Sequence, residues 1–340
     1  MSTATRRDRS RGSEREALSA LLGEVFAGRY RLLEPLGLDG GSRVFRARDD
    51  ILARDVAVKV FRADPRDASD PPRRLAAAHV LTGLDHPSLV TLYDAHLGRD
   101  GRGFLVMELI KGPTLRQHLD QDGPLPSDAA AGVLRDIARG LAAVHEAGIV
   151  HQRLRSSNTL LRPLRDGSRP FAAVLSDFGV TDLLERAARA DGLDLTVDTA
   201  EYLPPERVHG EGARPASDIY SLGLLMLEVL TAERPLSGGL VQDLLLDPLA
   251  YDPEIPTTFG YGWELLLTAM TARDPDARPT ASEVAALAAE LHDLPEPTPA
   301  TVITTDSPEP VPALRAVRQT RDVVARKRRP ALWTWVTHYH

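Results

Sequence analysis

The pattern of apolar and polar residues changes character about a third of the way along the chain. Up to residue 108, short runs alternate with a period of two or are rich in β-branched and aromatic residues, and Gly- and Asp-containing turns separate them. This pattern predicts strands at 29–38, 42–50, 54–62, 89–93 and 104–108.

Beyond this region the apolar residues repeat at helical spacing. Residues 127–147 carry an apolar stripe, with Ser127 as the expected N-cap and Gly148 closing the helix. A helix that opens near Ser217 is apolar on all sides, which predicts burial. The remaining predicted elements are helices at 14–27 and 71–84 and a short strand at 148–150. Strands followed by a helical remainder predict an α+β fold with two lobes.

The composition is that of a soluble globular chain. Of its 340 residues, 43% are hydrophobic, which is enough for a sizeable core, and none is cysteine, so disulfides and thiolate metal sites are excluded. No apolar run reaches about 18 residues, and the N-terminal segment lacks the apolar core of a signal peptide. We therefore expect a cytoplasmic protein.

The charge is distributed unevenly. Residues 314–340 hold seven Lys or Arg against one acid, so that of the net −7 the tail contributes +6 and residues 1–313 contribute −13. An acidic body argues against general nucleic-acid binding.

Candidate chemistry centres on residues 151–158, HQRLRSSN, which Asp177-Phe178-Gly179 follows after a further stretch of chain. This arrangement resembles the catalytic loop and metal-binding motif of protein kinases, H-R-D-L-x-x-x-N and D-F-G. The resemblance implies that Asn158 and Asp177 hold Mg²⁺ and that His151 and Phe178 belong to an internal stack. Asn and Asp in loops are more often turn residues, but the spacing favours the metal role here.

The position of the family's catalytic Asp holds Arg153. A guanidinium has no acceptor and stays protonated, so Arg153 cannot act as that base. Two neighbouring changes have other consequences. Arg155 replaces the usual Lys of the loop, which keeps the charge but not the reach or shape, and Gln152 replaces the Arg that reads a phosphorylated activation loop, so we expect that switch to be lost.

Residues 36–45 resemble the glycine-rich loop that approaches nucleotide phosphates, G-x-G-x-x-G-x-V. Gly37 and Val44 match the pattern, whereas Asp39 and Ser42 replace the second and third glycines. A carboxylate at Asp39 would repel phosphates. An ordinary glycine hairpin is the alternative for this segment taken alone.

The strand around Lys59 resembles the one that carries the phosphate-binding lysine of the family. The period of two places Ala57 and Lys59 on one face, and a solvated strand lysine is the alternative. The helix Glu that pairs with this lysine is expected nine residues before His86, where Ala77 stands, and there is no Glu between Lys59 and residue 107. Asp177 is the nearest substitute partner.

The segment after the strand at 104–108 resembles the hinge between kinase lobes, with Met107 as gatekeeper. By this resemblance the backbone of Glu108 and Ile110 faces an adenine ring, and Val44, Ala57 and Leu160 stack on the nucleotide.

Structural hallmarks of the family are better kept than catalytic ones. Glu206, in a Pro-Pro-Glu motif, is expected to pair with Arg278, and Asp218 to hold the backbone of the catalytic loop. These motifs make a small-molecule kinase of the aminoglycoside type the less favoured relative, and the chain looks closest to actinobacterial Ser/Thr kinases.

The resemblance implies a two-lobed protein-kinase-like fold over most of the chain. The expected divisions are a tail at 1–28, a kinase-like domain at 29–294 with lobes at about 29–108 and 113–294, a Pro-rich linker at 295–313 and a basic tail at 314–340.

The tail offers two further hypotheses. Thr298, Thr301, Thr304 and Thr305 are candidate phosphoacceptors that would dock a forkhead-associated domain, with an inert spacer as the simpler alternative. The basic run 326–329 and the two tryptophans that follow suggest peripheral contact with an anionic membrane, since the eleven residues after Arg329 are too few to span it.

The sequence thus predicts a pseudokinase: a kinase fold that binds other proteins as a regulatory or scaffolding module, with weak binding of ATP and Mg²⁺ and no other cofactor. Loss of a positioned base alone costs a factor of about 10²–10⁴ in rate. The alternatives are an active Ser/Thr kinase with an unconventional catalytic loop and a nucleotide-sensing regulator.

Overall fold

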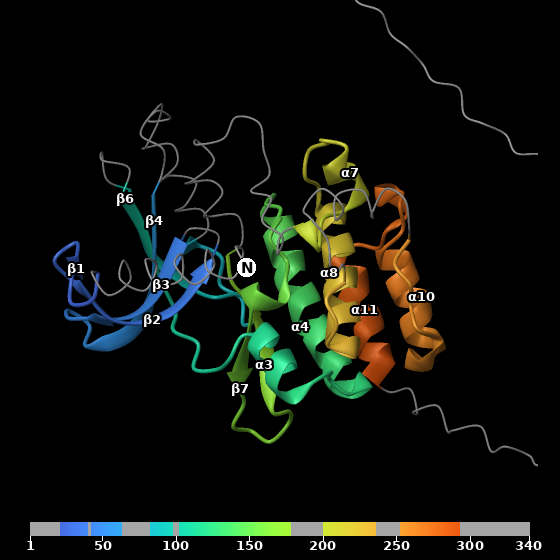
Figure 1. The fold of residues 1–340 in the computed structure, drawn as a ribbon, viewed down its shortest axis with the longest axis horizontal. Coiled ribbons are helices and arrows are strands. Elements are labelled where there is room, and N and C mark those ends of the chain that lie inside the picture. The colour runs from blue at the N-terminus through green and yellow to red at the C-terminus, as the bar shows by residue number, and fades with distance from the viewer. Residues whose placement is uncertain are drawn as a thin grey trace, which may run out of the picture. The chain divides into compact units, whose positions relative to one another are not determined.

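The computed structural model describes residues 21–39, 42–62, 82–97, 102–177, 200–235 and 252–292. All of them lie within one compact unit, Met1–Glu296. Within these residues an antiparallel sheet comes first and a mainly helical part follows, so the α+β prediction is confirmed (Figure 1). Ala77, Phe178, most of the predicted helix at 71–84 and the tail threonines lie outside the described residues.

The described part of the first lobe is a six-stranded antiparallel sheet in the order β1-β2-β3-β4-β6-β5. Its strands are β1 (Val25–Phe26), β2 (Tyr30–Asp39), β3 (Ser42–Asp49), β4 (Arg54–Arg62), β5 (Leu92–Leu97) and β6 (Arg102–Met107). The strands expected within 29–62 and at 104–108 are therefore confirmed to within two residues. Alternation on β4 packs Val56 and Val58 into the core of the sheet, while Ala57 and Lys59 lie on the other face.

Two predictions for this lobe are wrong in part. No helix forms over residues 21–27: Leu21 is buried in the sheet core, and the backbone of Gly23 and Glu24 bonds to Leu32, which extends the sheet by β1. The strand expected at 89–93 begins only at its fourth residue, because Leu89 forms a bridge to Leu175 in the second lobe instead.

The second lobe is built on helices, all but the shortest of which contribute to one large apolar core. They are α3 (Leu115–Asp122), α4 (Ser127–Glu146), α7 (Pro205–Val208), α8 (Pro215–Thr231), α10 (Tyr261–Met270) and α11 (Ala281–His292). In Figure 1, α4, α8 and α11 run beside one another. Helix α8 is buried along nearly its whole length, as its all-round apolar character predicts.

The helical prediction needs two corrections. A hairpin of β7 (Thr159–Pro163) and β8 (Phe171–Leu175) interrupts the helices. The strand expected at 148–150 does not form, since the N–H of Ile149 bonds back to the carbonyl of Val144 at the end of α4.

The N-cap of α4 also differs from the prediction. Pro126 holds that position, and the hydroxyl of Ser127 accepts a hydrogen bond of 2.8 Å from the indole of Trp263. Among the described residues no helix combines the length and apolar character that crossing a membrane requires.

The connection between the lobes passes very close to β7. A Cβ on Gly112 would lie 1.8 Å from the carbonyl oxygen of Leu161, so only glycine fits there. The N–H of Leu161 bonds to the carbonyl of Pro113 at 2.9 Å. This crossing fixes the end of β6 next to the β7–β8 hairpin and so sets the frame of the candidate site.

Candidate functional site

The loop 151–158 is held from below by one carboxylate on α8. Asp218, which is buried, accepts hydrogen bonds from the backbone N–H of His151 at 2.7 Å and of Gln152 at 2.8 Å. The ring of His145 lies 2.9 Å from the same carboxylate. Gln152 has a φ of +65°, a left-handed conformation that costs energy in a non-glycine residue. The carboxylate therefore fixes the backbone of the loop in a strained shape.

Asn158 closes the other end of this loop around Arg153. Its side-chain amide donates to the carbonyl oxygen of Arg153 at 2.9 Å, and the N–H of Ser176 donates to the Asn158 carbonyl at 2.9 Å. The residue at the expected position of the catalytic Asp is thus held at its backbone, and its side chain is half-buried. The loop is built, but it carries a cation where the family carries a base.

Lys59 and Asp177 meet across the two lobes. The ammonium lies 2.8 Å from each oxygen of the carboxylate, with the Lys59 side chain fully buried and that of Asp177 10% exposed. The alternative of a solvated strand lysine is therefore wrong. Asp177 has a left-handed φ of +65°. Lys59 thus has the substitute partner that the lack of a helix Glu suggests.

Positive charge surrounds this carboxylate. Burial acts to raise the pKa of Asp177, but the charge and hydrogen bond of Lys59, with smaller contributions from Arg153 and Arg155, outweigh it, and the pKa lies below its ordinary value. Asp177 is therefore ionised at neutral pH. Burial also lowers the pKa of His151, which keeps its imidazole neutral.

Mg²⁺ takes oxygen ligands from carboxylates, waters and phosphates. Here Lys59 holds both oxygens of Asp177, and Arg153 and Arg155 add positive charge beside it. Nowhere in the described ranges do three or more His, Asp or Glu side chains gather so as to hold a metal. As arranged, Asn158 and Asp177 do not fit a Mg²⁺ site.

The hinge keeps the backbone groups that an adenine ring needs. The N–H of Glu108 bonds to the carbonyl of Thr91 at 2.9 Å. No hydrogen bond among the described residues uses the carbonyl of Glu108 or the N–H of Ile110. Ile110 itself is buried in a small apolar cluster that Met107 and Leu160 contact. One acceptor and one donor therefore lie on the hinge beside an apolar wall.

The glycine-rich hairpin lines up with Lys59 through strand register. Gly37 pairs with Val44 across β2 and β3, and Val44 pairs with Lys59 across β3 and β4. Ala57, two residues before Lys59, pairs with Met107 at the start of the hinge. The sheet thus brings the sequence-predicted residues together. The tip of this hairpin and the side chains of residues 39 and 42 lie outside the described residues.

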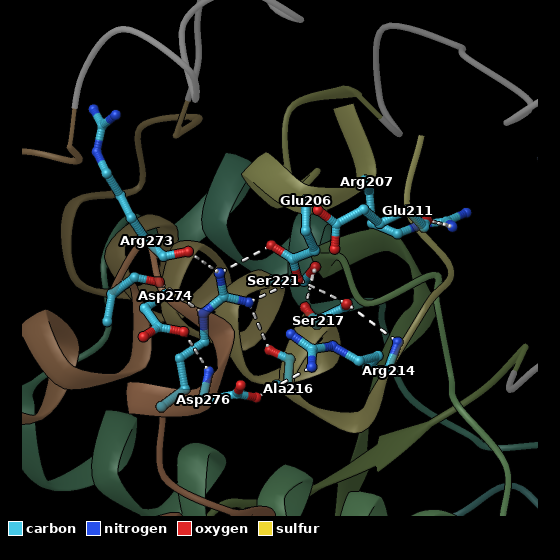
Figure 2. Close-up of polar contacts among 12 residues, drawn as sticks. Glu206, Arg207, Glu211, Arg214, Ala216, Ser217, Ser221, Arg273, Asp274 and Asp276 are labelled. Carbon is cyan, nitrogen blue, oxygen red and sulfur yellow. Dashed lines mark hydrogen bonds and ion pairs between the residues drawn. The ribbon is translucent and has the colours of Figure 1, made fainter. Parts of the chain in front are cut away.

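A second buried ion pair holds α7 to the segment that precedes α11 (Figure 2). Glu206 on α7 and Arg278 form two parallel hydrogen bonds of 2.8 and 2.9 Å, as the sequence leads us to expect. Ser217 donates to the same carboxylate at 2.8 Å, and Arg278 donates in addition to three backbone carbonyls. Burial tends to raise the pKa of Glu206, but Arg278 and Ser217 together hold it below its usual value.

Sequence reasoning missed one cluster that supports the loop. Glu228 on α8 is fully buried and accepts a hydrogen bond from Ser156 at 2.8 Å, and it also contacts Arg116 and the hydroxyl of Tyr202. The pKa of Tyr202 lies well above its ordinary value because of burial and this nearby carboxylate. The one sequence signal was an acid inside an otherwise apolar helix.

The sequence of the chain is similar to those of known protein kinases. The family model described as protein kinase domain matches residues 30–288. The chain is 34% identical over 273 residues to serine/threonine-protein kinase PknB of Mycobacterium leprae, covering 78% of this chain and 43% of that protein. It is 36% identical over 278 residues to serine/threonine-protein kinase PknL of Mycobacterium tuberculosis, covering 77% of this chain and 66% of that protein. The chain thus spans less than two thirds of the length of these relatives.

Proposed function

We propose, starting from the fact that this chain belongs to the protein kinase family, that it is a nucleotide-binding pseudokinase acting as a regulatory or scaffolding module. The observation that carries the proposal is Arg153 at the position of the catalytic Asp, in a loop whose backbone is held in place. The family's Asp accepts a hydrogen bond from the substrate hydroxyl and positions it for attack, and a guanidinium offers no acceptor for that role.

The surroundings of Arg153 support the loss of this step. Asp177 follows the loop in the same site, and Lys59 already engages both of its carboxylate oxygens. The loop is fixed through its backbone by Asp218 and Asn158. Absence of the positioned base would lower the rate of phosphoryl transfer by a factor of about 10²–10⁴.

Retained nucleotide binding is supported by the hinge and the strand register. The carbonyl of Glu108 and the N–H of Ile110 match the edge of an adenine ring, while Val44, Ala57 and Leu160 provide apolar surface above and below it. Lys59 is the cation for the phosphates.

A phosphotransfer assay on the full chain with a general acceptor protein, in Mg²⁺ and in Mn²⁺, tests the proposal. We expect transfer no higher than that of the Asp177→Ala variant. Arg153→Asp restores the missing acceptor and should raise the rate at least about tenfold. The matched control is Arg165→Asp, an equal charge change in the exposed β7–β8 turn. Robust wild-type transfer that Lys59→Ala and Asp177→Ala both abolish would overturn the proposal.

The second candidate is an active Ser/Thr kinase that uses an unconventional catalytic loop. The observation that favours it is the loop itself, whose backbone Asp218 and Asn158 hold in place although Arg153 stands at the position of the catalytic Asp. The relatives at 34% and 36% identity are also named as Ser/Thr kinases. The same assay distinguishes the two candidates. A nucleotide sensor, the third alternative, requires an ATP-dependent thermal shift without turnover.

The tail hypotheses remain predictions, since the tail lies outside the described residues. If the threonines at 298–305 dock a forkhead-associated domain, mass spectrometry of protein from its native host should find phosphate on them. Protein without phosphate there would argue for an inert spacer.

A further inference from the structure

We propose that this site binds the phosphates of a nucleoside triphosphate without a divalent cation, and that Lys59, Arg153 and Arg155 take the electrostatic role that Mg²⁺ has in the family. The inference rests on the nucleotide-binding part of the proposed function. It starts from the misfit between the residues present and Mg²⁺.

The phosphate end of the site carries more positive charge than the family pattern does. The family pattern has two cations and two carboxylates at positions 59, 153, 155 and 177, which sum to zero. This chain has three cations and one carboxylate there, which leaves a net charge of +2. The difference equals the charge of one Mg²⁺ ion. A bound Mg²⁺ would therefore meet repulsion where the family offers it carboxylates.

The one carboxylate of this set is already engaged by a cation. Asp177 is the remaining acidic member of the set, and Lys59 binds both of its oxygens at 2.8 Å. The loop that carries both arginines is bonded to the segment just before Asp177, since Asn158 donates to the carbonyl of Arg153 at 2.9 Å and accepts from the N–H of Ser176 at 2.9 Å. Both arginines come from one short loop whose backbone Asp218 and Asn158 hold in place, so the loop needs no change of its backbone to present them.

Guanidinium groups are well suited to bind phosphates. A guanidinium presents planar, paired donors that match phosphate oxygens, and it keeps its charge at every relevant pH. Arg153 is half-buried, so part of it remains in reach of solvent and ligand. The inference requires only that both guanidiniums contribute positive charge beside Lys59, whatever other contacts they make within the chain.

Isothermal titration of the full chain with adenosine and ATP, each in excess EDTA and in excess Mg²⁺, tests the inference. We expect ATP in EDTA to bind at least about tenfold more tightly than adenosine, because the phosphates add charge-assisted contacts. Mg²⁺ should weaken ATP binding, since it neutralises part of the triphosphate charge that the three cations recognise. ATP binding that requires Mg²⁺ would overturn the inference and leave the proposed function standing. Failure of both ligands under both conditions would overturn nucleotide binding itself.

Two variants sharpen the test. Arg153→Asp should lose at least about tenfold in affinity for ATP in EDTA and gain affinity on addition of Mg²⁺, while Arg165→Asp, in the exposed turn, should match the wild type. Asp177→Asn removes the anion that competes for Lys59, and it should tighten ATP binding in EDTA severalfold. A metal-dependent site predicts the opposite sign for Asp177→Asn. If that variant does not fold, the reversal of metal dependence in Arg153→Asp decides the matter alone.

Discussion

Two buried ion pairs have similar geometry but different surroundings in this molecule. Glu206–Arg278 and Asp177–Lys59 both use two carboxylate oxygens at 2.8 to 2.9 Å. The first lies within the helical lobe, where a serine and three carbonyls complete the hydrogen bonding. The second joins the two lobes at the edge of the proposed nucleotide site.

The two pairs therefore differ in how completely their polar groups are satisfied by the surrounding chain. A buried pair is strongly needed when every lone pair and N–H is satisfied, because removing one partner strands the others. A pair at the boundary of two lobes can be relieved by solvent or ligand. The following changes test this difference.

The largest effect is expected for Arg278→Ala. It leaves Glu206 and three carbonyls without their donor, so the free energy of unfolding should fall by about 3–5 kcal/mol, measured by urea denaturation. The control is Arg214→Ala, which removes an exposed pair with Asp276 nearby and should cost less than about 1 kcal/mol. Similar losses in both variants would refute the distinction between a completed network and a surface pair.

A smaller effect, with a characteristic pH dependence, is expected for Lys59→Met. The pKa of Asp177 is depressed in the wild type, so its contribution to stability is present above pH ~4 and is lost as the pH falls further. Without Lys59, burial becomes the dominant influence and raises that pKa, so the variant loses stability as the pH rises above ~4. The difference in unfolding free energy should be smallest near pH ~3 and reach roughly 1–3 kcal/mol near pH ~7.

Urea denaturation across this range measures the trend. Lys111→Met at the exposed hinge, as the control, should show no such trend. A difference between Lys59→Met and wild type that stayed constant with pH would mean that the pair does not control the ionisation of Asp177.

The smallest effect is expected at the hinge. Arg162 on β7 grips the carboxylate of Glu108 at 2.8 and 2.9 Å, but both side chains are nearly a third exposed. Arg162→Ala should therefore lower the free energy of unfolding by only about 0.5 kcal/mol, and salt should reduce the effect further. A loss above about 2 kcal/mol would mean that the hinge pair contributes to stability on the same scale as Glu206–Arg278.

Local patterns were sufficient to predict most elements of the fold and the ordering of its motifs. The alternating runs within 29–62 form strands, and the apolar stripe of α4 forms a helix, because each follows from the period of its own residues. Motif spacing also brought Lys59 and Asp177 to the same site, where 118 positions separate them along the chain.

Contacts made across the fold could not be predicted in this way. Ser127 is a good N-cap by its chemistry, but its hydroxyl bonds to Trp263 on a distant helix. Leu21 was predicted to lie in a helix, but its side chain packs in the core of the sheet. Glu228 gave no sign that it would hold Ser156, since its partners come from three separate segments. In each case tertiary packing outweighed local preference.

The way Asp218 holds the loop has a consequence for how this site can evolve. Its carboxylate binds the amides of two consecutive residues, and every amino acid except proline supplies that amide. This contact therefore places no demand on the side chain of the next residue, Arg153. The backbone contact would be the same whether position 153 carried a carboxylate or the guanidinium of Arg153.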